Sequence, residues 1–79
     1  LKSKITKKMN TNKKYYINRN SQVTGEFEVH REDCTYIFFI EDALCLGEFS
    51  SCEEAMSVAR RLYPNVDGCA FCCRRCHTR

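Results

Sequence analysis

The sequence predicts an α+β fold. We expect a small antiparallel sheet of three to four strands, one main helix at about residues 51–62, and a C-terminal cysteine knuckle or short helix. Three observations lead to this: strand-type segments before residue 50, one amphipathic segment after it, and a cysteine-dense C-terminal end. A chain of 79 residues is enough for one domain only. A core of that size supplies roughly 3–5 kcal/mol of stability, so a staple is expected.

The N-terminal part of the chain divides into a tail and two strands. Residues 1–12 are polar and basic without any period, which predicts a disordered basic tail in front of a single small cysteine-rich domain at residues 13–79. Residues 14–18 contain Tyr and Ile of high strand propensity. From Gly25 the chain alternates, with Phe27 and Val29 on one side and polar residues on the other, which predicts a half-buried strand.

The middle of the chain predicts a hairpin. Residues 34–40 form a continuous run of strand-forming side chains, residues 41–42 a turn, and residues 43–49 a second strand. The run at 36–40 has more large side chains than so small a domain can cover. We therefore expect part of it to be exposed as a surface for a partner or for dimer formation.

The segment after residue 50 predicts the main helix. Ser50 or Ser51 is the expected N-cap, with a glutamate three residues later. An apolar stripe follows at helical spacing: Ala55, Val58, Ala59 and Leu62. Acidic residues occupy the first turn and basic residues the last, as the helix dipole favours, and Pro64 ends the helix. Residues 65–68 read as a loop.

Cysteines then follow at i, i+3, i+4 and i+7, which would share one face if the segment were helical: Cys69, Cys72, Cys73 and Cys76. Their C-x-x-C spacing lets one turn present two thiolates to one ion, but a structural zinc ion takes four ligands. His30 and Cys34 supply an upstream pair, so the predicted ligands of one structural Zn²⁺ are His30, Cys34, Cys69 and Cys72. The alternates are Cys73, Cys76 and His77. Such a site would tie the first strands to the knuckle, with the helix packed between them.

Simpler interpretations of the same residues remain open. His30 taken alone fits an exposed histidine on the polar face of a strand, and Cys34 fits a small buried hydrophobic residue. Residues 1–20 have no apolar run long enough for a signal-peptide core and the chain has no membrane-span pattern, so we expect a cytoplasmic protein with reduced thiols. The alternatives are a metal-free disulfide-stapled protein, which the odd count of seven cysteines disfavours, and a thiol redox protein.

Charge is strongly asymmetric along the chain. Residues 1–20 carry seven basic groups and no acid, whereas all ten acids lie within residues 21–67. A basic N-terminal segment joined to an acidic domain is typical of proteins that bind nucleic acid, although a solvated tail has the same composition. The expected phosphate-contact residues are Lys13, Lys14, Arg19, Arg74, Arg75 and Arg79. We expect the partner to be nucleic acid or another protein.

No grouping of residues predicts an enzyme. The chain shows no Ser/His/Asp pattern and no carboxylate pair, and its three glycines are too scattered for a phosphate loop. We therefore expect a binding module without catalytic activity.

Several short motifs resemble one known family: Asn18-Arg19-Asn20-Ser21, Val29-His30 with Cys34, Leu46-Gly47-Glu48-Phe49-Ser50, Glu53-Glu54-Ala55 and Cys69-x-x-Cys72. Residues 16–77 are similar to the small zinc-binding domain of Ada-type methyl-phosphotriester DNA repair regulators and to related modules appended to nucleases and competence proteins. The resemblance implies one zinc ion held by a pair at x-x-x spacing and a later C-x-x-C. His30 replaces the cysteine that accepts the methyl group in that family, so methyl transfer is not expected. The segment between helix and knuckle is also longer, and four cysteines are additional.

Overall fold

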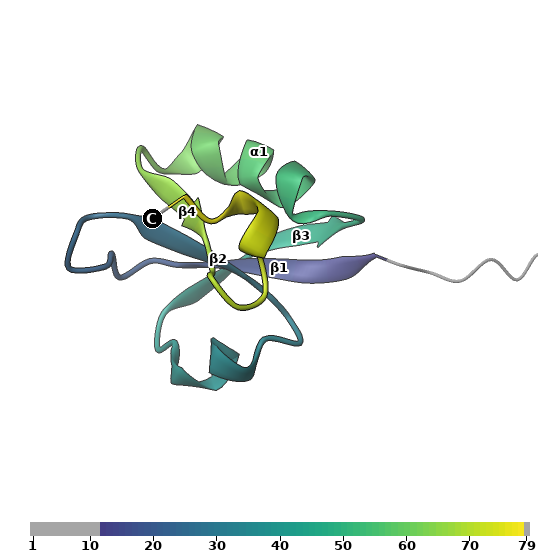
Figure 1. Cartoon of the computed structure of the whole chain (residues 1–79), viewed down its shortest axis with the longest axis horizontal. Coiled ribbons are helices and arrows are strands. Elements are labelled where there is room, and N and C mark those ends of the chain that lie inside the picture. Colours follow the sequence, from purple (N-terminus) through teal and green to yellow (C-terminus); the bar gives the residue numbers. More distant parts are fainter. Residues whose placement is uncertain (1–11, 79) are drawn as a thin grey trace, which may run out of the picture.

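The computed structural model describes residues 12–78 and has the predicted α+β architecture. Four strands form one mixed sheet in the spatial order β3-β1-β2-β4, and α1 covers one of its faces (Figure 1). The elements are β1 Lys13–Asn18, β2 Phe27–Arg31, β3 Ala43–Phe49, α1 Cys52–Leu62 and β4 Val66–Gly68, with 3-10 helices η1 Thr35–Phe39 and η2 Arg74–Cys76. Within residues 12–78, no helix has the length and apolar character needed to cross a membrane.

The core lies between the sheet and α1. β1 pairs antiparallel with both β2 and β3, and Ile17 and Val29 are opposite each other and fully buried. They pack with the buried Ala55, Met56 and Ala59 of α1. Because successive strand residues point to opposite faces, the neighbouring His30 is directed away from the helix. The expectation that the helix packs between the first strands and the cysteine knuckle they are tied to is therefore wrong, because the ligand side of β2 faces away from α1.

The predicted helix is confirmed, including its N-terminal cap. The Ser51 hydroxyl accepts a hydrogen bond from the backbone N–H of Glu54 at 3.3 Å, and the Glu54 carboxylate accepts one from the Ser50 N–H at 2.9 Å. These reciprocal bonds satisfy N–H groups that a helix start otherwise leaves without partners. Tyr63 forms the C-cap, one residue before Pro64.

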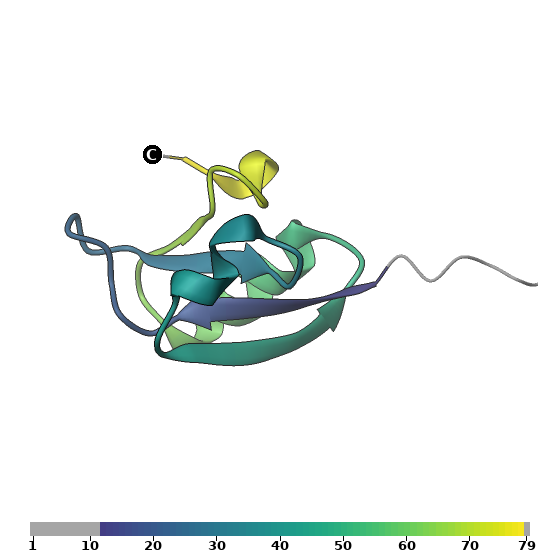
Figure 2. The ribbon, with the colours of Figure 1, turned by 90° about the horizontal axis from the view of Figure 1, so that it is seen from below.

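Two predictions about the loops are wrong. Residues 34–40 form no strand and no hairpin with residues 43–49; they contain η1, which lies on the other side of the sheet from α1 (Figures 1 and 2). β3 pairs with β1 and forms an edge of the sheet, and within residues 12–78 no strand lies on its outer side. Residues 66–68, expected to be part of a loop, form β4, which pairs in parallel with the outer edge of β2.

The C-terminal cysteine segment is not one helix. After β4 the chain turns, and η2 occupies only residues 74–76. The four cysteines therefore do not line a common face. Cys69 and Cys73 are buried, whereas Cys72 and Cys76 are half-buried. The predicted basic tail falls almost wholly on residues 1–11, outside the described residues.

Candidate metal centre

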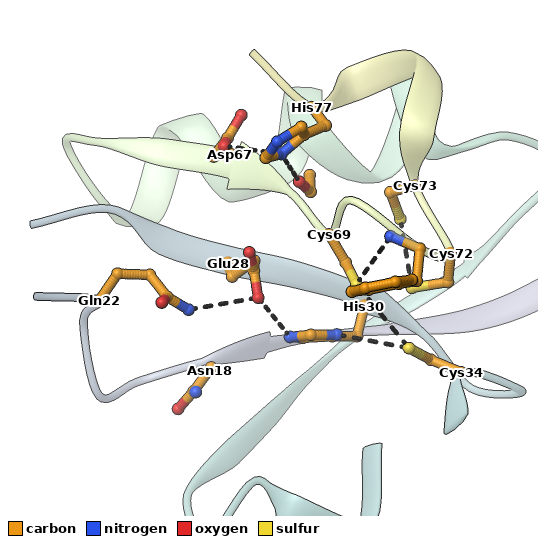
Figure 3. Close-up of polar contacts among 12 residues, drawn as sticks. Asn18, Gln22, Glu28, His30, Cys34, Asp67, Cys69, Cys72, Cys73 and His77 are labelled. Carbon is orange, nitrogen blue, oxygen red and sulfur yellow. Dashed lines mark hydrogen bonds and ion pairs between the residues drawn. The ribbon is translucent and has the colours of Figure 1, made fainter. Parts of the chain in front are cut away.

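The fold brings together the four residues predicted from sequence as metal ligands. His30 comes from β2, Cys34 from the N-cap of η1, and Cys69 and Cys72 from the turn after β4 (Figure 3). One ligand atom from each lies within 4.8 Å of every other. The group can hold a metal ion, and three of its four members are buried.

Backbone pairing explains how these residues meet. The parallel register aligns Val29 with Gly68, and the Cys69 N–H donates to the Val29 carbonyl at 2.9 Å. This bond places Cys69 beside the strand position of His30. On the other side, the Cys34 N–H donates to the Arg31 carbonyl at 2.9 Å, which turns the chain back after β2. The short strand β4 is thus the element that delivers the C-x-x-C pair.

His30 is oriented by contacts on both of its ring nitrogens. Its Nδ1 lies 3.7 Å from the Cys34 sulfur, and its Nε2 lies 3.2 Å from Oε1 of Glu28, which also accepts a hydrogen bond from the Gln22 amide at 3.2 Å (Figure 3). A carboxylate on the second nitrogen is the usual way in which a metal-binding histidine is fixed. The interpretation of His30 as an exposed strand residue is wrong, because only 4% of it is exposed.

Glu28 and Gln22 were not predicted from the sequence. The available signal is spacing: Glu28 precedes His30 by two residues and so shares its face of β2. Burial by itself lowers the pKa of His30, but hydrogen bonds to Cys72 and Glu28 and the nearby Cys69 together raise it to about 10. The surroundings of His30 therefore strongly favour a positive charge at this position.

Backbone amides point at two of the sulfurs. The Arg31 N–H donates to the Cys72 sulfur at 3.2 Å, and the Phe71 N–H donates to the Cys69 sulfur at 3.4 Å. Such bonds stabilise a thiolate more than a neutral thiol, because the acceptor carries charge. The turn thus supports sulfur in the form that binds metals.

The thiols of the cluster are weak acids. Burial raises the pKa values of Cys34 and Cys69. A hydrogen bond with the Cys73 sulfur, followed by burial, raises the pKa of Cys72 to about 11. An exchange-active thiol needs a lowered pKa, so these shifts are opposite to those of a thiol redox site.

The alternate ligands lie outside this cluster. Cys73 is in the hydrophobic core, with its sulfur 3.9 Å from that of Cys72. The Nδ1 of His77 is 2.9 Å from the Gly68 carbonyl and 3.2 Å from an Asp67 oxygen. Cys76 belongs to a separate group with Cys52 and Glu53.

The predicted phosphate-contact residues are dispersed and partly paired with acids. Lys13 lies 3.8 Å from Asp33, Arg19 2.8 Å from Asp42, and Arg75 3.3 Å from Glu53. Lys14 and Arg74 are exposed residues for which the described part of the chain shows no ion pair, and Arg79 lies outside it. The structure therefore does not gather these residues into one basic patch.

The seven cysteines all lie within the described residues, and none is joined in a disulfide. No model of a known family, no curated protein and no solved structure matches the chain. The case for a function therefore depends on the chemistry of the cluster and of the surface around it.

Proposed function

We propose that this chain is a binding module stabilised by one structural zinc ion held by His30, Cys34, Cys69 and Cys72. The interatomic distances carry the proposal. Two sulfurs bound to a tetrahedral zinc ion at ~2.3 Å are about 3.8 Å apart, and a sulfur and a nitrogen about 3.6 Å. The Cys34 and Cys69 sulfurs are 3.9 Å apart, and His30 Nδ1 is 3.7 Å from the Cys34 sulfur.

The ligand set supports a structural role for the ion. Three sulfurs and one imidazole are a donor set that zinc uses in structural sites, where protein groups fill all four positions. His30, Cys34 and Cys69 are each at most 4% exposed, which leaves little access for a substrate. We therefore propose that the zinc ion holds loops in place and performs no catalysis.

Metal removal is the direct test of this proposal. Because a preformed site is absent from the unfolded chain, metal-binding free energy is folding free energy, and a chelator should unfold the domain. Circular dichroism during chelation, with native mass spectrometry of the same sample, should show loss of structure together with loss of the ion. A domain whose fold and melting temperature are unchanged after complete metal removal would contradict the structural role.

Two cysteine variants locate the ion. Cys69→Ser should lower the bound zinc by one ion and destabilise the domain strongly, because a buried ligand is lost. Cys45→Ser is the matched control, since Cys45 is exposed and outside the cluster, and it should keep both metal and stability. Equal metal content in the two variants would contradict the assigned ligands. Metal-free protein with a mass lower by two hydrogens per bridge would favour the disulfide-stapled alternative.

The binding role is supported by an aromatic surface next to the ion site. Its members are Tyr36, Phe38 and Phe39 of η1 and Phe71 of the C-x-x-C turn. Phe38 is 90% exposed, Phe39 77% and Phe71 68%, and the rings of Tyr36 and Phe71 are 4.7 Å apart. Exposed aromatic residues in such number typically mark an interaction site. The two loops that carry the metal ligands also carry this surface.

We propose that this surface binds single-stranded nucleic acid. Its bases would stack on the exposed aromatic rings, and Arg74, which follows Phe71 closely in the sequence, would supply positive charge for the phosphates. Anisotropy with a labelled single-stranded oligonucleotide should show binding that weakens steeply between 50 and 200 mM salt, by roughly tenfold or more for a few phosphate contacts. At any one salt concentration, Phe38→Ala should bind the oligonucleotide more weakly than wild type does. Binding that is absent or independent of salt would instead favour a protein partner or a second copy of this chain at residues 36–40.

A further inference from the structure

A second group of metal-binding side chains lies where the N-terminus of α1 meets the C-terminal segment. Cys52 and Glu53 are the first two residues of α1, and Cys76 is the last residue of η2. Both sulfurs and a Glu53 oxygen lie within 4.8 Å of one another. We propose that Cys52, Glu53 and Cys76 form a second site, for a divalent ion of the zinc class, whose fourth position is open.

The two oxygens of Glu53 have different neighbours. Oε1 lies 3.7 Å from the Cys52 sulfur, on the side of the group, whereas Oε2 lies 3.3 Å from Nε of Arg75. One oxygen is thus available to an ion while the other is held by a cation. A carboxylate ligand held in this way by an outer hydrogen-bonding group is common at metal sites.

The charge that the group would carry as a set of ligands suits a cation. Once deprotonated, the two thiols and the carboxylate would carry three negative charges, of which a divalent ion would offset two. Arg75 and the positive end of the helix dipole offset part of the remainder, because the ligands Cys52 and Glu53 occupy the first turn of α1. Cys52 is only 9% exposed, so its sulfur has little solvation from bulk water.

The group also borders an open space. A cleft of about 350 Å³ lies between the start of α1, with Ser51, Cys52 and Glu53, and the segment carrying Arg74 and Arg75. Zinc sites with three protein ligands and one open position bind water or an exogenous ligand, whereas four protein ligands close a site. The second ion is therefore expected to be bound more weakly than the first and to exchange its fourth ligand.

The location gives the second site a structural consequence. Cys69 and Cys72 join the start of the C-terminal segment to His30 on β2, whereas Cys76 would join its end to α1. The only helix within this segment is η2, three residues long. An ion at each end would fix a segment that regular secondary structure hardly supports.

Zinc titration of the full, reduced chain followed by native mass spectrometry tests the second site. Wild type and the control Cys45→Ser should each bind two ions at saturation. Cys76→Ser should bind one, and Glu53→Gln, a change at an exposed residue that should leave folding intact, should weaken the second ion about tenfold or more. Cadmium-113 NMR of wild type should show two resonances, of which Cys76→Ser loses one.

Two results would overturn the second site: saturation of wild type at one ion, or two ions retained by Cys76→Ser with affinity unchanged in Glu53→Gln. The inference does not depend on the first site. Cys76→Ser and Glu53→Gln keep all four ligands of the first site, so the second ion is measured in a domain that retains the tighter one. A single tight ion that both variants retain would exclude the second site and leave the first intact.

Discussion

Glu28 contacts the ring nitrogen of His30 that faces away from the sulfurs. Its carboxylate lies 3.2 Å from Nε2, while Nδ1 is directed at Cys34. For a neutral imidazole this contact holds the proton on Nε2 and leaves the Nδ1 lone pair for the ion. In the proposed site Glu28 would therefore act on the metal through the histidine, and its loss should lower the metal affinity and leave the number of bound ions unchanged.

Glu28→Gln should weaken zinc binding by about 10–100-fold, the usual effect of removing an outer partner of a ligand histidine. The measurement is competition with a chromophoric chelator at constant pH. Glu48→Gln, at an exposed residue of β3, is the matched control and should leave the affinity unchanged. Equal affinities in the two variants would show that Glu28 does not position His30.

At the residue scale, spacing in the sequence was sufficient to predict the four residues that the fold brings together, but not the orientation of their side chains. The His30 and Cys34 pair and the C-x-x-C motif identify the donor types, which can be read from the sequence alone. The roles of Glu28 and Gln22 depend on which face of β2 is covered and on how the chain turns before it. Those facts arise from tertiary packing, which no local pattern specifies.

The elements that the sequence did not predict are those set by pairing. Residues 34–40 have strand propensity, but the chain forms η1 there, and β3 pairs with β1 instead of with this segment. Residues 66–68 include Asp67 and Gly68, residue types that are rare in strands, yet they pair with β2. In contrast, α1 was predicted closely because its cap, stripe and charge pattern are all local.

Gly68 ends β4 where the C-terminal segment passes closely over it. A Cβ at this position would lie 2.7 Å from the Cys73 carbonyl oxygen and 2.7 Å from Cβ of Cys76. Gly68→Ala should therefore push the segment away and destabilise the domain by about 1–3 kcal/mol, as overpacking does. Chemical denaturation measures the change in the free energy of unfolding.

Gly25→Ala is an informative comparison for Gly68→Ala. Nothing lies within 4 Å of a Cβ at Gly25, so any cost there comes from its positive φ of 100° and not from a clash. Gly68→Ala should in addition lower zinc affinity, whereas Gly25→Ala should not. Unchanged zinc affinity in Gly68→Ala would mean that the C-x-x-C turn tolerates displacement of the segment after it.

For the whole molecule, the proposed ion would join parts of the chain that are distant in sequence. Cys34 and Cys69 are 35 residues apart, and their sulfurs approach to 3.9 Å. Closing so long a loop costs conformational entropy, which a metal ion offsets more effectively than a small core alone. Folding and metal binding are therefore expected to be one coupled process. Both should depend on pH, because the ligands release protons when they bind the ion.

Acid should release the ion, and zinc binding should release several protons from the ligands. Zinc binds thiolates and neutral imidazole, so each ligand must give up its proton. The pKa of His30 is raised to about 10 and that of Cys72 to about 11, and burial raises those of Cys34 and Cys69. At pH 7 all four groups therefore hold protons that compete with zinc, and affinity is lost as pH falls.

Calorimetry in buffers of different ionisation enthalpy should count up to about four protons released per ion. Cys45→Ser should release the same number, and affinity that does not change between pH 6 and 8 would contradict binding by these four ligands.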